Sequence, residues 1–295
     1  MNRNAGYIFL GVGVLVLLGA AYFLLPSAPE PVPEEPIELP EVREPAPEPA
    51  TKVIGSSVEG REITVTKLGS GDKHLLFVGG IHGGYEWNSV VLAEDMIDRF
   101  EADPALIPDS ITVSIIPNLN PDGVVEALGV EGEITFEDGA NDPGDGTGRF
   151  NKNGVDLNRN FDCKWQPESS WRGNTVSAGT EPFSEPEAQA LRDYVTEIKP
   201  VAVIFWHSQA NNVYASECEE GVLPETLDIM NVYATAASYG AVPVFDAYPV
   251  TGDAEGWLAS IGIPAITVEM STHTTLDWIR NVAGVEALFE YYATE

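Results

Sequence analysis

Short apolar runs alternate with longer segments of helical periodicity over most of the chain. Residues 74–81, 111–117, 201–206 and 265–269 indicate buried strands, and residues 53–55 and 61–65 flank a turn and predict an opening hairpin. Apolar positions that share one helical face predict helices at residues 86–100, 185–199, 224–239 and 275–292. Strands alternating with helices favour an α/β fold, a single domain whose mostly parallel or mixed central sheet is flanked by helices on both faces.

The helix at residues 185–199 carries a sequence signal for its start. Ser184 precedes it and Glu187 lies three residues further on, which is the spacing of a capping box. We therefore predict Ser184 as the N-cap of this helix.

The first fifty residues depart from this pattern. Residues 7–25 are an uncharged apolar run, and 19 helical residues span about 28 Å, close to the hydrocarbon core of a bilayer. We interpret residues 1–25 as an N-terminal transmembrane helix or signal-anchor, with secretion after signal cleavage as the alternative. Arg3 before the run and acidic residues after it place the remainder of the chain outside the cytoplasm. Residues 26–50 contain nine Pro and seven Glu and predict a disordered linker, which leaves residues 51–295 as the catalytic domain.

Charge and cysteine content narrow the class of partner. Seven acids and two bases precede Thr51, so the rest of the chain carries 39 acids against 13 bases of the total 46 and 15. The negative electrostatic field of such a domain repels a phosphate backbone, and nucleic acid is excluded as a partner.

The only two cysteines, Cys163 and Cys218, do not have zinc-site spacing. Both a single disulfide and two buried thiols fit the sequence, and we favour the disulfide for a domain outside the cytoplasm.

Metal-ligating side chains lie at the ends of three of the predicted strands. His82 follows one strand and is four residues before Glu86, His207 follows a second strand, and Glu269 ends a third. Because ligands bind at the carboxyl ends of the strands in such sheets, these side chains are expected to meet there. A catalytic zinc needs three nitrogen or oxygen ligands from the protein and one open position for water. His82, Glu86 and His207 can supply the three ligands.

Six sequence blocks, in order along the domain, carry a resemblance to a known family. They are GGIHG at residues 79–83, NPDG at 120–123, GVDLNRNF at 154–161, FSEPE at 183–187, WHS at 206–208 and GIPAITVE at 262–269. Together they resemble the zinc carboxypeptidases typified by the pancreatic enzymes, and more closely the bacterial members. The family normally has two residues between the first His and Glu, whereas this chain has three; Tyr85 stands at the usual Glu position, so Glu86 is taken as the ligand.

The resemblance implies a role for each site residue. One Zn²⁺ per chain would be held by His82, Glu86 and His207, with Glu269 as general base and Arg149 stabilising the developing oxyanion. Asn158 and Arg159 would bind the terminal carboxylate of the substrate, since a guanidinium offers donors matched to two oxygens.

Two further residues concern the substrate pocket. Tyr248 corresponds to the mobile tyrosine that closes over bound substrate, with Tyr214 and Tyr233 as rivals by position. Glu255 falls near the bottom of the side-chain pocket, where an acid would favour Lys, Arg or a diamino acid. The alternative for Glu255 is an exposed helix glutamate.

These residues imply a zinc metallocarboxypeptidase that acts on peptides with a free C-terminus. Two other functions stay open. One is a zinc deacylase or amidase of small N-acyl amino acids on the same fold. The other is a non-catalytic binding domain, which only the longer spacing between His82 and Glu86 supports.

Overall fold

The computed structural model describes residues 49–294. The predicted transmembrane helix and almost all of the predicted linker lie outside these residues. Among the helices of residues 49–294, none is both long and apolar enough to cross a bilayer.

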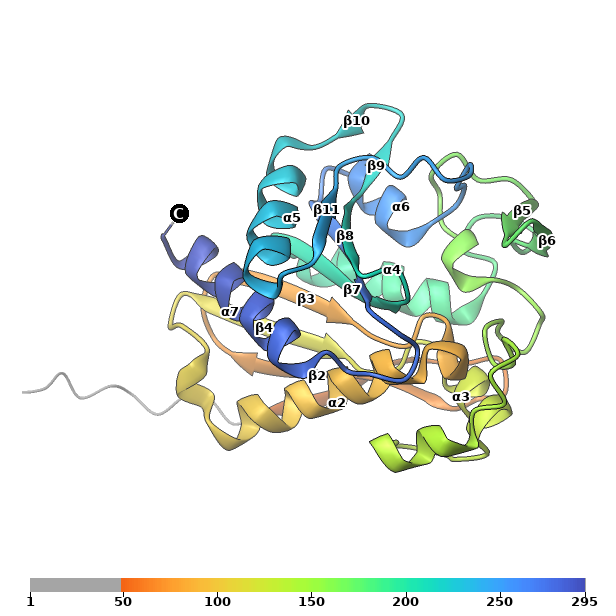
Figure 1. The fold of residues 1–295 in the computed structure, drawn as a ribbon, viewed down its shortest axis with the longest axis horizontal. Helices are drawn as coiled ribbons and strands as arrows, with labels where there is room; N and C mark the ends of the chain where they lie inside the picture. Colours follow the sequence, from red (N-terminus) through yellow and green to blue (C-terminus); the bar gives the residue numbers. More distant parts are fainter. Residues whose placement is uncertain (1–48, 295) are drawn as a thin grey trace, which may run out of the picture. The chain divides into compact units, whose positions relative to one another are not determined.

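The domain is built on an eight-stranded mixed sheet (Figure 1). Its strand order is β1-β2-β4-β3-β7-β12-β8-β11. The four strands β4, β3, β7 and β12 run parallel, β1 and β2 pair antiparallel at one edge, and β8 pairs antiparallel with β12 near the other. The strands are β1 (Ala50–Ser56), β2 (Glu62–Gly69), β3 (Lys73–Val78), β4 (Ile111–Ile116), β7 (Ala202–Ser208), β8 (Asn212–Ala215), β11 (Gly240–Val242) and β12 (Ala265–Met270).

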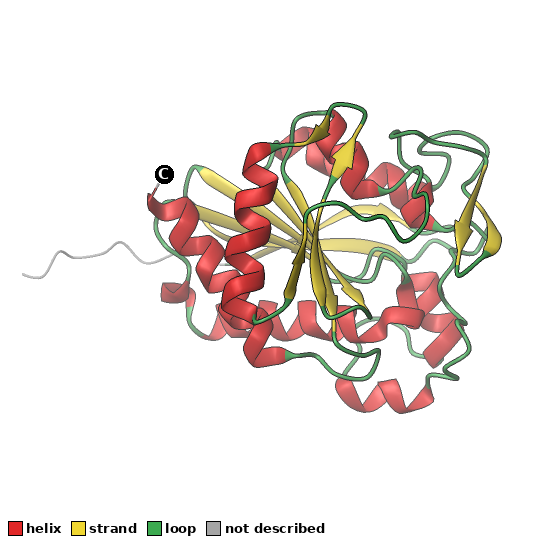
Figure 2. Ribbon diagram, turned by 45° about the horizontal axis from the view of Figure 1, so that its top comes forward, coloured by secondary structure: helices red, strands yellow, loops and turns green. Residues whose placement is uncertain are grey.

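Helices cover both faces of this sheet (Figure 2). Alternate residues of the central strands point to opposite faces, so Leu75 and Phe77 of β3 join one core cluster and Leu76 and Val78 join the other. The first cluster includes residues of α2, α5 and α7, and the second includes residues of α4 and α6. The helices are α2 (Trp87–Ala102), α3 (Pro121–Leu128), α4 (Pro186–Ile198), α5 (Pro224–Ala237), α6 (Ala254–Ser260) and α7 (Trp278–Thr294).

Smaller elements complete the domain. The hairpin of β5 (Glu168–Trp171) and β6 (Asn174–Ser177) and the hairpin of β9 (Glu217–Cys218) and β10 (Gly221–Val222) form two separate two-stranded sheets. Four short 3₁₀ helices are η1 (Gly83–Glu86), η2 (Pro104–Leu106), η3 (Phe136–Asn141) and η4 (Leu157–Arg159). Cys163 and Cys218 form a disulfide, which joins the segment after η4 to β9.

The structure confirms the predicted α/β domain, with its opening hairpin, its four buried strands and helices on both faces. The predicted start of α4 is wrong. The N-cap is Glu185, in extended conformation and without a side-chain capping bond. Pro186 occupies the first helical position and biases the residue before it towards an extended backbone. The helix therefore begins one residue later than the Ser184 capping box requires.

Candidate metal centre and substrate pocket

A cavity of about 630 Å³ opens at the carboxyl ends of β3, β7 and β12. His82 follows β3, Glu86 closes η1 at the start of α2, and His207 and Glu269 are paired neighbours on β7 and β12. Gly83 makes the sharp turn between His82 and Glu86 possible. It has φ +47°, and a Cβ there would lie 2.7 Å from the carbonyl oxygen of Gly148.

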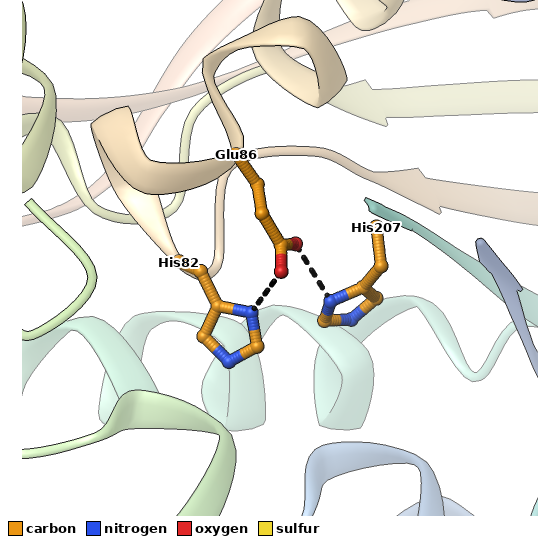
Figure 3. Close-up of side chains that lie close together, drawn as sticks. All are labelled: His82, Glu86 and His207. Atoms are coloured by element: carbon orange, nitrogen blue, oxygen red, sulfur yellow. Dashed lines mark hydrogen bonds and ion pairs between the residues drawn. The ribbon is translucent and has the colours of Figure 1, made fainter. Parts of the chain in front are cut away.

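His82, Glu86 and His207 converge on one point (Figure 3). The Nδ1 atom of His82 lies 3.0 Å from Oε1 of Glu86, and Nδ1 of His207 lies 2.9 Å from Oε2 of the same carboxylate. One ligand atom from each residue falls within 4.8 Å of the other two, and all three side chains are buried. Two imidazoles and one carboxylate are the donor set of a catalytic zinc site, so these residues fit the ion.

The η1 turn absorbs the extra residue between His82 and Glu86. Glu86 points towards the histidines, whereas the ring of Tyr85 packs against Trp171, at 5.3 Å between centroids, and against His273, at 4.6 Å. The longer spacing is therefore compatible with a three-ligand centre, and Tyr85 forms part of the cavity wall.

Each ligand histidine has a carboxylate beside its other ring nitrogen. Oδ1 of Asp156 lies 3.4 Å from Nε2 of His82, and Oε1 of Glu255 lies 3.4 Å from Nε2 of His207. Thr267 donates a hydrogen bond of 2.8 Å to the same oxygen of Glu255. Such outer carboxylates fix the orientation of metal-binding imidazoles and raise their basicity. The alternative interpretation of Glu255 as an exposed helix residue is wrong, because the residue is only 3% exposed.

The buried charges shift one another. Burial opposes ionisation of Glu86, but the adjacent His82 and His207 hold its pKa well below the usual range. Burial also disfavours a charged His207, yet Glu86 and Glu255 raise its pKa. The two pKa shifts show that the Glu86 carboxylate and the neighbouring imidazoles attract each other electrostatically.

Glu269 and Arg149 line the same cavity as this centre. Burial, reinforced by the charge of Glu86, raises the pKa of Glu269 to about 7, and its Oε2 is buried without a hydrogen-bond partner. A bound divalent cation would oppose this shift. Arg149 donates two hydrogen bonds to Asp156, of 3.2 and 2.9 Å, and lies 3.9 Å from Glu86. A proton acceptor and a fixed cation thus border the same space.

Asn158 and Arg159 lie further along the same cavity. The amide oxygen of Asn158 accepts a hydrogen bond from the backbone of Ala254 at the start of α6. Arg159 donates to the carbonyl oxygens of Asn158 and Ser170 but forms no ion pair with a carboxylate among residues 49–294. Its guanidinium therefore keeps positive charge available to an anion in the cavity.

Of the three candidate tyrosines, two line the cavity. Tyr248 is 37% exposed and packs edge-to-face on Phe245, which in turn contacts Tyr214. Tyr233 is fully buried in the core and is hydrogen-bonded to Trp206 and Asn281. Tyr233 is thereby excluded, and Tyr248 and Tyr214 remain.

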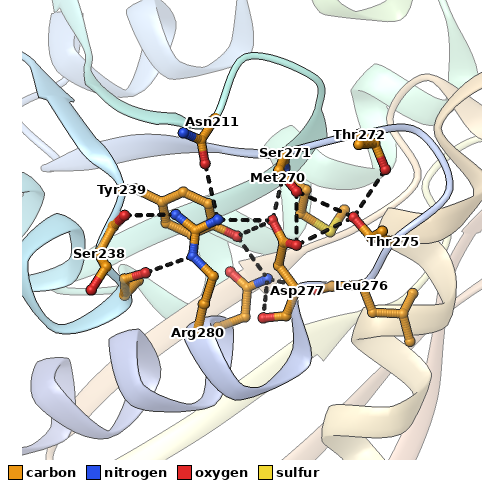
Figure 4. A network of polar contacts seen from close by, with 12 residues as sticks. Asn211, Ser238, Tyr239, Met270, Ser271, Thr272, Thr275, Leu276, Asp277 and Arg280 are labelled. Carbon is orange, nitrogen blue, oxygen red and sulfur yellow. Dashed lines mark hydrogen bonds and ion pairs between the residues drawn. The ribbon is translucent and has the colours of Figure 1, made fainter.

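A polar network fixes the segment that follows Glu269 (Figure 4). Arg280 lies over the ring of Tyr239 at 3.6 Å and donates to Asn211 and Asp277, while Asp277 accepts from the backbone and hydroxyl of Ser271. Helix α7 begins at Trp278, three residues later than predicted. The network holds the chain just beyond the strand that carries the expected base.

Residues near the site that the sequence analysis did not assign come mostly from loops. Asp156 belongs to a recognised block, and its place two residues before Asn158 is the signal that could have singled it out. Trp171 and Arg172 of the β5–β6 hairpin line the cavity but have no sequence signal of their own.

Comparisons with known proteins agree with this geometry. The family model described as zinc carboxypeptidase matches residues 39–278. A carboxypeptidase B from Astacus astacus is 31% identical over 243 residues, covering 79% of this chain and 75% of that protein. A γ-D-glutamyl-L-diamino acid endopeptidase 1 from Lysinibacillus sphaericus is 26% identical, covering 75% of this chain and 60% of that protein. The crystal structure of a murein-tripeptide amidase from Escherichia coli O157 shares the fold, with a TM-score of 0.59, 24% identity, and coverage of 82% of this chain and 90% of that one.

Proposed function

Because the chain belongs to the zinc carboxypeptidase family, we propose that it hydrolyses the C-terminal peptide bond of peptides with a free C-terminus. The observation that carries the proposal is the unpaired guanidinium of Arg159, beside Asn158, in the cavity that also holds the His82–Glu86–His207 cluster. A buried guanidinium that forms no salt bridge with a carboxylate among residues 49–294, next to a hydrolytic centre, supports recognition of a terminal carboxylate.

We assign a role to each side chain of the site. Zinc held by His82, Glu86 and His207 would supply a Lewis acid that lowers the pKa of water and polarises the scissile carbonyl. Glu269 accepts the proton of the attacking water and returns it to the leaving amine. Arg149, held by Asp156, stabilises the negative charge that develops on the carbonyl oxygen. Tyr248 closes over the bound substrate.

The residue released is proposed to carry a basic side chain. Glu255 is buried, and its side-chain contacts with His207 and Thr267 both involve Oε1. A Lys, Arg or diamino acid side chain would pair with the remaining oxygen. A second candidate function on the same site is cleavage of a γ-glutamyl–diamino acid bond, which the related endopeptidase and the acid in this pocket both favour.

We also propose that the domain works outside the cytoplasm, tethered to the membrane by residues 1–25. The Cys163–Cys218 disulfide supports an oxidising compartment. A reporter fused after Glu295 that is active only in the cytoplasm would contradict this topology.

Blocked dipeptides ending in Lys test the proposed function, assayed with a free and with an amidated C-terminus. The amide is expected to be cleaved about a hundredfold more slowly, because it leaves the Arg159 guanidinium unpaired. Arg159→Gln should remove this difference, and Arg192→Gln, a control on the surface of α4, should keep it. Equal cleavage of both substrates by the wild-type enzyme would refute the exopeptidase proposal. A dipeptide in which Glu is joined to Lys through its γ-carboxyl group, assayed beside the α-linked isomer, tests the second candidate function.

A further inference from the structure

Ion pairing among the arginines of residues 49–294 sets two of them apart. Five form an ion pair with a carboxylate: Arg61, Arg99, Arg149, Arg192 and Arg280. No such pair exists in this part of the chain for Arg159 or Arg172, and both line the catalytic cavity. In a domain with 39 acids and 13 bases, most arginines are expected to pair with a carboxylate, so an arginine without an ion pair is unusual. Arg159 already has a proposed anion, the terminal carboxylate, whereas Arg172 has none.

The backbone at Arg172 is held in a conformation that this residue type disfavours. Arg172 and Gly173 are the two loop residues of the β5–β6 hairpin, between the paired residues Trp171 and Asn174. Both have positive φ, +49° and +77°, as in a type I′ turn, where Asn or Gly is preferred at the first position. A left-handed arginine at the rim of a catalytic cavity points to a function for the side chain.

The hairpin carries Arg172 to the outer part of the cavity. Arg172 is exposed, and its guanidinium lies 5.3 Å from the ring centroid of Trp171 and 5.8 Å from that of Tyr85. Trp171 also packs under Arg149, at 4.5 Å, and the preceding Ser170 accepts a hydrogen bond from Arg159. Two aromatic faces thus orient Arg172 without neutralising its charge.

The direction of a bound peptide then decides what Arg172 meets. With the terminal carboxylate on buried Arg159 and the scissile bond at the His82–Glu86–His207 cluster, the acyl part of the substrate runs towards the exposed rim. Arg172, at the hairpin tip, is an exposed cation of the cavity lining, whereas Arg159 is buried. The cavity is also less acidic than the domain: it is lined by four of the 13 bases and five of the 39 acids.

We propose that Arg172 binds a carboxylate on the acyl side of the scissile bond. This inference rests on the proposed function and adds to it a substrate class: peptides with two carboxylates, one at the C-terminus for Arg159 and one upstream for Arg172. A charged partner on the substrate would replace the protein carboxylate that Arg172 lacks.

Two peptides that differ in one group test the proposal: N-acetyl-Glu-Lys and N-acetyl-Gln-Lys. For the wild-type enzyme kcat/KM is expected to be about twofold to fivefold higher with Glu, as for a solvent-accessible ion pair, and the preference should vanish in high salt. Arg172→Gln should abolish the preference by lowering kcat/KM for the Glu peptide alone. Arg192→Gln removes the same charge far from the cavity lining and should preserve the preference. An Arg172→Gln enzyme that loses activity equally on both peptides, or on neither, would overturn the proposal.

Binding measurements test the Arg172 subsite independently of whether the protein acts as a carboxypeptidase. If the wild-type enzyme cleaves neither peptide, the proposed function fails, and the two peptides are titrated calorimetrically into Glu269→Gln protein. Tighter binding of the Glu peptide that disappears in the double variant Glu269→Gln, Arg172→Gln supports the subsite. Equal dissociation constants for the two peptides would refute it.

Discussion

Replacing Glu255 by Gln should weaken zinc binding, although Glu255 is not itself a ligand. The substitution keeps the size of the side chain and a hydrogen-bond acceptor near Nε2 of His207, but it removes the negative charge 3.4 Å from that nitrogen. A charge-assisted hydrogen bond is about twice as strong as a neutral one, so the loss is about 1 to 1.5 kcal/mol. This corresponds to a zinc dissociation constant raised roughly five- to twelvefold, at the lower end of the effect of outer-shell substitutions.

Chelator competition on the metal-free protein measures this change directly. Glu217→Gln is the matched control, because Glu217 lines the same cavity but pairs with Lys164 rather than with a ligand. The control should bind zinc as the wild type does. A zinc dissociation constant for Glu255→Gln within twofold of the wild-type value would refute the claim that this carboxylate supports His207.

Three further outcomes follow from the site and the fold. Glu269→Gln should lower kcat roughly a thousandfold, the size of a general-base contribution, while zinc content measured by atomic absorption stays unchanged. Burial and neighbouring carboxylates raise the pKa of Glu94 to about 7, against 4.5 in an unstructured chain, so its ionisation destabilises the fold as the pH rises through this interval. Glu94→Gln should therefore increase the urea unfolding free energy by about 1 to 3 kcal/mol at pH 8 and leave it nearly unchanged at pH 4. Replacing Cys163 and Cys218 by Ala opens a loop with a sequence separation of 55, which should lower the unfolding free energy by about 4 kcal/mol.

Each of these outcomes has a control. Loss of zinc together with activity in Glu269→Gln would show that Glu269 holds the metal site together rather than acting as a base. Glu101→Gln removes an exposed acid from the same helix as Glu94; if it stabilises the protein as much at pH 8, the gain reflects net charge instead of burial. The double cysteine variant should unfold alike with and without reductant, whereas reductant should destabilise the wild type.

The central architecture was predictable because its signals are local. The apolar strands that precede His82 and His207 are continuous runs, and parallel strands end at one edge of a sheet, which brings their following residues together. The short strands β8 and β11 were not predicted, since four residues with two buried positions and three residues with none carry no clear periodicity.

Contacts between distant segments account for what the sequence could not reveal. The burial of Glu255 arises because α6 packs beside β12 and places the carboxylate between Thr267 and His207. The position of Arg172 depends on a hairpin whose strands are short and largely polar. The spacing between His82 and Glu86 departs from that of the family, and only the η1 turn shows how Glu86 reaches the histidines.

Metal content of purified protein, with wild type and Glu86→Ala compared, tests the central claim most directly. We expect one zinc ion per wild-type chain, and loss of stoichiometric zinc together with peptidase activity in Glu86→Ala. An exposed substitution such as Glu131→Ala should retain both. Wild-type protein without stoichiometric zinc, or a Glu86→Ala variant that binds zinc as tightly as the wild type, would contradict the account.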